Sequence, residues 1–113
     1  MANTQNLQID QGIDYSRSMT IYDANKNIFS LNGYTGKGHI KKSFTSPTFV
    51  AFTVTILDAA AGRMQISLTH TQTEALSAGN YVYDLYIKNL EGKSYKVTEG
   101  IITVVQSVTK YSA

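Results

Sequence analysis

Apolar and polar side chains alternate along most of this chain, with the period of two that is typical of half-buried β-strands. Tyr15, Met19 and Ile21 alternate with polar side chains, for example, and turns rich in Asn, Asp and Gly separate one such run from the next. The pattern predicts about seven strands. They cover residues 7–9, 15–22, 34–43, 49–57, 64–68, 81–87 and 95–104.

The phase of the alternation predicts which side chains face the core. The expected core positions on the most apolar strands are Val50, Phe52, Val54, Ile56, Met64, Ile66, Leu68, Tyr81, Tyr83, Leu85, Ile87, Tyr95 and Val97. Gly36 and Gly38 also fall at core positions, so we expect an aromatic side chain of the facing sheet to fill the space above them. Arg17 shares the phase of core residues, and we expect it at the rim, with its stem packed and its guanidinium in solvent.

Two further features predict local irregularities. The phase of the last strand slips before Ile102, which predicts a β-bulge at Glu99 and Gly100. Thr71 and Glu74 have the spacing of a capping box, which predicts a single helical turn that begins there.

The segment from Asp23 to Asn27 has two interpretations. Asp and Asn at alternate positions match the first oxygen ligands of a calcium loop. Ile28 stands where that loop needs glycine, however, and Tyr34 stands where it needs glutamate. An ordinary turn, in which the Asp and Asn side chains bond nearby backbone, is the better interpretation.

A tyrosine at the start of a long strand points to the architecture. Ser77, Ala78 and Gly79 form a small-residue turn, and Tyr81 is the first inward residue after it. In Greek-key sandwiches a tyrosine in this place folds over the preceding corner and its hydroxyl bonds upstream backbone. With no βαβ alternation, we expect an all-β, immunoglobulin-like Greek-key β-sandwich with one short helical turn. Residues 7–105 form it, between a flexible N-terminal segment (1–6) and a flexible C-terminal tail (106–113).

Composition narrows the class of protein. The chain has 113 residues, 42% of them hydrophobic and 16% charged, which is typical of one folded domain. A net charge of +2 is too small to indicate nucleic-acid binding. There is no cysteine, no apolar run long enough for a membrane span and no secretory signal, so we expect folding in a cytoplasm and no membrane partner.

Candidate catalytic and metal-binding groups are sparse. His39 and His70 are the two histidines and lie on different predicted elements, and neither is part of the two-His spacing of a metal site. No serine lies on a Gly-x-Ser-x-Gly turn, and the carboxylates fall in solvated loops. We therefore predict no enzymatic activity, no cofactor and no bound metal.

The outward positions of the strands carry the candidate interface. Lys37, His39 and Lys41, with Lys42 beside them, form the main electrostatic feature, which either contacts a partner or protects a strand edge from aggregation. Aromatic residues also point outward at Tyr22, Phe49 and Tyr86, and tyrosine is enriched in protein interfaces.

The order of the turn and core motifs resembles a known group of proteins. One half of the resemblance is carried by residues 11–17, 23–27 and 31–35, and the other by residues 61–68, 78–85 and 99–104. In this order and spacing they are similar to the small immunoglobulin-like domains of tailed-bacteriophage virion proteins, such as the N-terminal domain of upper baseplate proteins and stand-alone structural proteins of myophages.

The resemblance implies a non-catalytic virion subunit, made in the host cytoplasm, that docks on the tail, baseplate or neck in symmetric copies beside other virion proteins. No receptor-binding segment follows the domain, which favours an accessory subunit over host recognition. The alternatives are a decoration protein of the capsid surface and a carbohydrate-binding module; the lack of tryptophan counts against the second.

Overall fold

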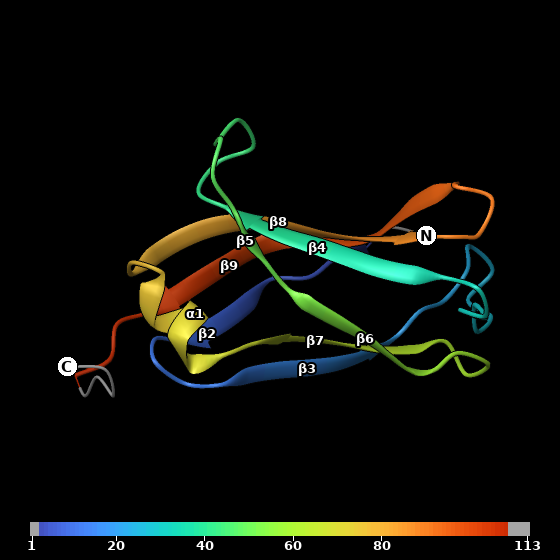
Figure 1. Cartoon of the computed structure of the whole chain (residues 1–113), viewed down its shortest axis with the longest axis horizontal. Helices are drawn as coiled ribbons and strands as arrows, with labels where there is room; N and C mark the ends of the chain where they lie inside the picture. The colour runs from blue at the N-terminus through green and yellow to red at the C-terminus, as the bar shows by residue number, and fades with distance from the viewer. Residues whose placement is uncertain (1–2, 109–113) are drawn as a thin grey trace.

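Two β-sheets pack face to face in the computed structural model, which describes residues 3–108 (Figure 1). The larger sheet contains β1 (Asn3–Thr4), β2 (Leu7–Asp10), β4 (Thr35–Lys41), β5 (Val50–Ala51), β8 (Gly79–Lys88) and β9 (Ser94–Val105). The smaller sheet contains β3 (Tyr15–Thr20), β6 (Thr53–Asp58) and β7 (Arg63–Leu68). A short helix, α1 (His70–Ala75), lies at one end of the sandwich (Figure 1). The predicted all-β sandwich is confirmed.

The strand order is that of an immunoglobulin-like sandwich. The larger sheet runs β1-β9-β8-β4-β5, and β2 also pairs with β9, in parallel. The smaller sheet runs β3-β7-β6. Consecutive strands therefore change sheets repeatedly, which produces the Greek-key connections.

The core lies between the two sheets and is made by the inward residues of both. Met64, Ile66 and Leu68 of β7 and Leu85 and Ile87 of β8 are buried in one core cluster, as the alternation predicts. Burying such side chains stabilises the fold by about 1.5–3 kcal/mol each relative to exposing them. Among residues 3–108 there is no helix of the length and hydrophobicity that crossing a bilayer requires.

The strand expected over residues 49–57 is divided into two. β5 pairs with β4 in the larger sheet, and β6 pairs with β7 in the smaller one. Phe52 lies at the crossing, buried in the core, with its N–H bonded to the Gly38 carbonyl at 2.9 Å. The predicted core face is confirmed. The prediction of a single strand was wrong, because the segment leaves the larger sheet after β5 and joins the smaller sheet as β6.

The β-bulge lies closer to the hairpin than predicted. Leu85 pairs with Thr98 and Tyr86 pairs with Lys96, so the extra residue of β9 is Val97 and not Glu99 or Gly100. Both Val97 and Thr98 are buried. The phase slip in the sequence was real, but its position depends on the pairing with β8.

The helix begins two residues earlier than the predicted capping box. Its N-cap is Thr69, whose side chain accepts from the Gln72 N–H while Gln72 Oε1 accepts from the Thr69 N–H. The prediction of Thr71 and Glu74 was therefore wrong. Both pairs have the same spacing, and the end of β7 at Leu68 decides between them.

The space above the two core glycines is filled mainly by aliphatic side chains. A side chain at Gly36 would meet Val54 and Met64, and one at Gly38 would meet Leu85 and Phe52. The expected aromatic residue is thus present at Gly38 alone, and it comes from the crossing between the sheets.

The segment predicted to be flexible at the N-terminus is paired where it is described. Asn3 and Thr4 pair with β9, and the Gln5 N–H donates to the Glu99 carbonyl at 2.9 Å. The hydroxyl of buried Tyr83 donates to the Gln5 carbonyl. Residues 3–5 are thus tied to the larger sheet by backbone and side-chain hydrogen bonds. Residues 1–2 and, in the C-terminal tail, 109–113 lie outside the described part of the chain.

Candidate functional site

The outer face of the larger sheet brings together most of the predicted interface residues. Inward and outward positions alternate on β4, so Gly38 and Ile40 face the core while Lys37, His39 and Lys41 face outward. On the neighbouring β8 the outward residues are Val82, Asp84 and Tyr86. The antiparallel register sets Lys37 opposite Tyr86, His39 opposite Asp84 and Lys41 opposite Val82.

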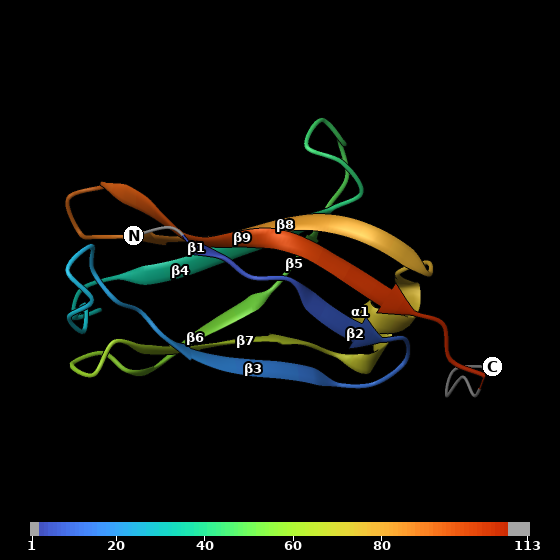
Figure 2. The ribbon, with the colours of Figure 1, turned by 180° about the vertical axis from the view of Figure 1, so that it is seen from behind.

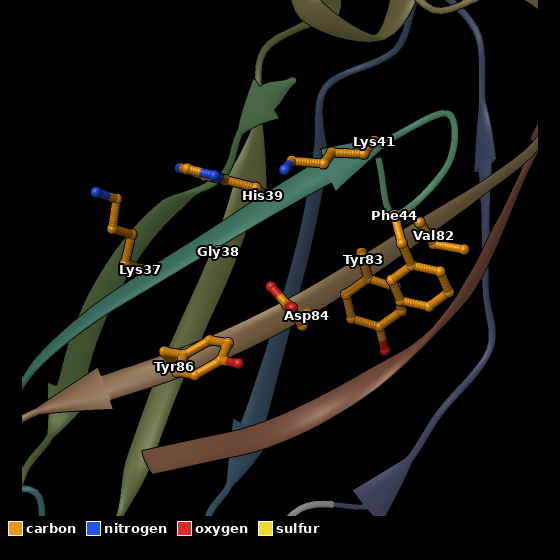
Figure 3. A pocket seen from close by; sticks show the side chains of 9 residues that line it. All are labelled: Lys37, Gly38, His39, Lys41, Phe44, Val82, Tyr83, Asp84 and Tyr86. Carbon is orange, nitrogen blue, oxygen red and sulfur yellow. The ribbon is translucent and has the colours of Figure 1, made fainter. Parts of the chain in front are cut away.

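These residues surround a hollow of about 330 Å³ on the sheet (Figure 3). Figure 3 shows the three cationic or imidazole side chains along β4 and Asp84 and Tyr86 along β8. The loop between β4 and β5 stands out from this face (Figure 1) and contributes Phe44, of which 77% is exposed. We call this set the outer-face site. Its lining residues are Lys37, Gly38, His39, Lys41, Phe44, Val82, Tyr83, Asp84 and Tyr86.

The His39 ring is covered on one face by an aromatic side chain. Its ring stacks on that of Phe49, with the ring centroids 3.9 Å apart and the planes inclined by 13°. Burial, followed by the positive charge of Lys37, lowers the pKa of His39, although the Asp84 carboxylate acts in the opposite direction. The imidazole therefore stays neutral to a lower pH than an ordinary histidine and presents a flat, uncharged surface.

On the side of the site next to β9, the charged side chains of Lys96 and Glu99 lie near Tyr86. Lys96 of β9 has its Nζ 5.8 Å from the centre of the Tyr86 ring and 3.5 Å from Glu99 Oε2. Tyr86, and then Glu99, raise the pKa of Lys96. The lysine is therefore held as a cation beside an aromatic ring that is itself 37% exposed.

Two predicted interface residues lie elsewhere. Lys42 turns toward the corner at the start of β8, where its Nζ is 4.6 Å from the centre of the Tyr81 ring and 3.3 Å from the Asn80 carbonyl oxygen. Gly79, at φ +136°, lies beside that Nζ in a backbone conformation that favours glycine. Tyr22 follows β3 in the smaller sheet.

Phe44 and Asp84 line the site but are not among the interface residues predicted from the sequence. Phe44 lies in a loop rich in Ser and Thr, where a large aromatic residue has no core to join, and that mismatch was the available signal. Asp84 carries no signal of its own, because its place opposite His39 comes from the register of β4 with β8.

The remaining candidate groups are separated from this site. His70 begins α1, where its Nδ1 lies 3.0 Å from Asp14 Oδ1. Asp23 Oδ1 accepts the N–H groups of Asn25 and Asn27 at 2.8 and 3.0 Å, which is the predicted turn geometry. Within residues 3–108 no three His, Asp or Glu side chains are grouped as a metal site would require. The outer-face site thus offers aromatic surfaces and cations for binding.

Comparison with known proteins identifies no family. No protein-family model matches the chain, and no curated protein matches it. Among solved structures, it is similar to part of a family 123 glycoside hydrolase from Clostridium perfringens, with 14% sequence identity and a TM-score of 0.43. That similarity covers 94% of this chain and 23% of the hydrolase, and no catalytic assignment follows from it.

Proposed function

We propose that this protein is a non-catalytic structural subunit of a tailed-phage virion that docks on the tail, baseplate or neck through its outer-face site. The observation that carries the docking role is the composition of that face. Phe44, Phe49 and Tyr86 are 77%, 52% and 37% exposed on one side of one sheet, where Lys37 and Lys41 also line the site. Exposed aromatic residues gathered in this way are typical of interaction surfaces.

The virion setting comes from the resemblance of the turn and core motifs to immunoglobulin-like virion domains. A subunit of such an assembly needs a rigid scaffold and a surface that binds its neighbours. The two-sheet core supplies the first, and the outer-face site, held on two long paired strands, supplies the second.

The location is tested by antibody-gold labelling of intact tailed particles from cultures that produce the protein, imaged by electron microscopy. Label on the tail, its tip or the neck is the expected result. A uniform coat on the head would replace the proposal with the alternative of a capsid decoration protein. Unlabelled particles, in a culture whose cleared lysate contains the protein, would overturn the virion assignment.

The docking face is tested by incorporation of variants into particles. Tyr86→Asp adds a second carboxylate to the outer-face site besides Asp84, and we expect its incorporation to fall by about tenfold or more. Leu90→Asp, at the exposed tip of the β8–β9 hairpin, is the matched control and should assemble normally. Equal incorporation of both variants would exclude this face as the docking surface.

The carbohydrate-binding alternative is favoured by one observation, the exposed Phe49 ring stacked on His39. Binding of the isolated protein to a glycan array, lost in Phe49→Ala, would support that alternative over docking to protein.

A further inference from the structure

The smaller sheet has a regular edge strand that is open to solvent. All six residues of β3 pair with β7, from Tyr15 opposite Leu68 to Thr20 opposite Arg63, without a break in register. In the strand order β3-β7-β6 no described strand pairs with the other side of β3. Figure 2 shows β3 at this edge, with β1 and β2 of the other sheet running above it. β3 thus has neither the proline nor the bulge that commonly protects an edge.

The backbone of alternate residues of β3 points into this open side. The Ile21 N–H donates to the Gly62 carbonyl, next to β7, at 2.8 Å. Because backbone groups of successive residues in a strand point in opposite directions, the odd-numbered residues of β3 also face β7. The N–H and C=O groups of Ser16, Ser18 and Thr20 therefore point away from β7.

A groove of about 400 Å³ lies along this edge, between the two sheets. One wall is β3 and the residues after it, and the other is formed by Gln5 and by Val97 and Thr98 of β9. Arg17 lies in the groove with its side chain exposed. Burial raises the pKa of the Tyr15 hydroxyl, and the charge and hydrogen bond of Arg17 oppose that shift. No carboxylate within residues 3–108 forms an ion pair with Arg17.

We propose that the β3 edge binds an extended segment of another polypeptide as an additional strand, and that an acidic side chain of this segment pairs with Arg17. The row of outward N–H and C=O groups provides the main-chain hydrogen bonds of β-strand addition. The guanidinium provides the selectivity, because a strand without a carboxylate would cover a charge and leave it unpaired.

The charge of the edge also argues against a second copy of this chain as the occupant. Two β3 strands paired about a two-fold axis would bring two Arg17 guanidinium groups to one short edge, where neither forms an ion pair with a carboxylate of residues 3–108 in the single chain. Arg17 on its own hinders such self-pairing, as an inward-pointing charge does on edge strands in general. An acidic partner removes this obstacle, and a basic or neutral one does not.

The test uses a short blocked peptide of alternating valine and threonine with a central glutamate, titrated into the full-length protein and followed by NMR. We expect saturable shifts of the amide signals of Ser16, Ser18 and Thr20, which exceed those of Met19, whose N–H faces β7. The same peptide N-methylated at alternate residues lacks the N–H groups that β3 requires, and it should not bind. Arg17→Gln should weaken binding on the order of tenfold, the effect of one charge-assisted hydrogen bond.

A charge exchange provides the matched control. Arg17→Glu should bind the analogous peptide with a central lysine and not the one with glutamate, while the unfolding midpoints of both variants show that the fold is intact. Three results would overturn the proposal: no shifts at millimolar peptide, equal binding of the N-methylated peptide, or concentration-dependent shifts of the same amides without peptide, which would mean a second copy. This inference goes beyond the proposed virion role and does not depend on it, because peptide binding and particle labelling can fail independently.

Discussion

The hydroxyl of Tyr81 donates a hydrogen bond to the backbone carbonyl of Ser77 at 2.9 Å. This bond closes the corner between α1 and β8, so the strand that carries half of the outer-face site leaves the corner in a defined direction. Lys42 covers the same ring from the end of β4. The corner therefore joins the two strands on which the site is built.

Tyr81→Phe removes the corner hydrogen bond and leaves the ring in place. We expect the free energy of unfolding to fall by about 1 kcal/mol, the net value of one such bond. Urea denaturation followed by circular dichroism measures it. Tyr86→Phe is the control, because Tyr86 lies on the exposed face of the sheet. Equal losses of unfolding free energy in both variants would show that the corner hydrogen bond does not stabilise the fold.

Gly38→Ala should destabilise the sandwich by about 1–3 kcal/mol, the usual cost of overpacking a core. A Cβ atom there would lie 3.0 Å from the Asp84 carbonyl oxygen and 3.1 Å from the Phe52 ring, besides its contact with Leu85. Lys37→Ala, on the same strand but with an exposed side chain, is the comparison in thermal unfolding. An unchanged midpoint for Gly38→Ala would mean that the neighbouring Leu85 and Phe52 side chains make room for a methyl group without cost.

The Asp14–His70 pair should make stability depend on pH at the acid end. The side-chain and backbone hydrogen bonds from His70 lower the pKa of Asp14. A carboxyl whose pKa is lower in the folded state contributes stability above its unfolded pKa and loses that contribution as the pH falls through the folded pKa. Acid titrations should therefore diverge below about pH 4, where Asp14→Asn shows a flatter loss of stability than the parent. Parallel curves would show that the exposed pair is too screened to matter.

The pKa of His39 should lie below 6.5, the ordinary value for histidine. Burial is the main cause. Because the Phe49 ring stacks on the imidazole, we expect Phe49→Ala to expose it and raise this pKa, and Lys37→Gln should raise it by removing a nearby cation. NMR titration of the imidazole signals measures both variants in the intact domain. A pKa that does not move in Phe49→Ala would contradict the stacked arrangement.

Because alternation is a local property, the strands, most of their core faces and the hairpin before β9 were predictable from the sequence. Met64, Ile66 and Leu68 are buried as their period of two requires. The corner tyrosine was likewise predictable, because Tyr81 bonds a residue four positions upstream and the motif is contained in one short segment.

Only the tertiary structure decided the features that depend on pairing between distant segments. The crossing at Phe52 arises because β5 and β6 pair with different sheets, and the bulge lies at Val97 because β8 sets the register of β9. The outer-face site has the same origin: Lys37 and Tyr86 are 49 positions apart in the chain, and register makes them neighbours. A period of two states which way a side chain points, but it contains no information on which strand lies beside it.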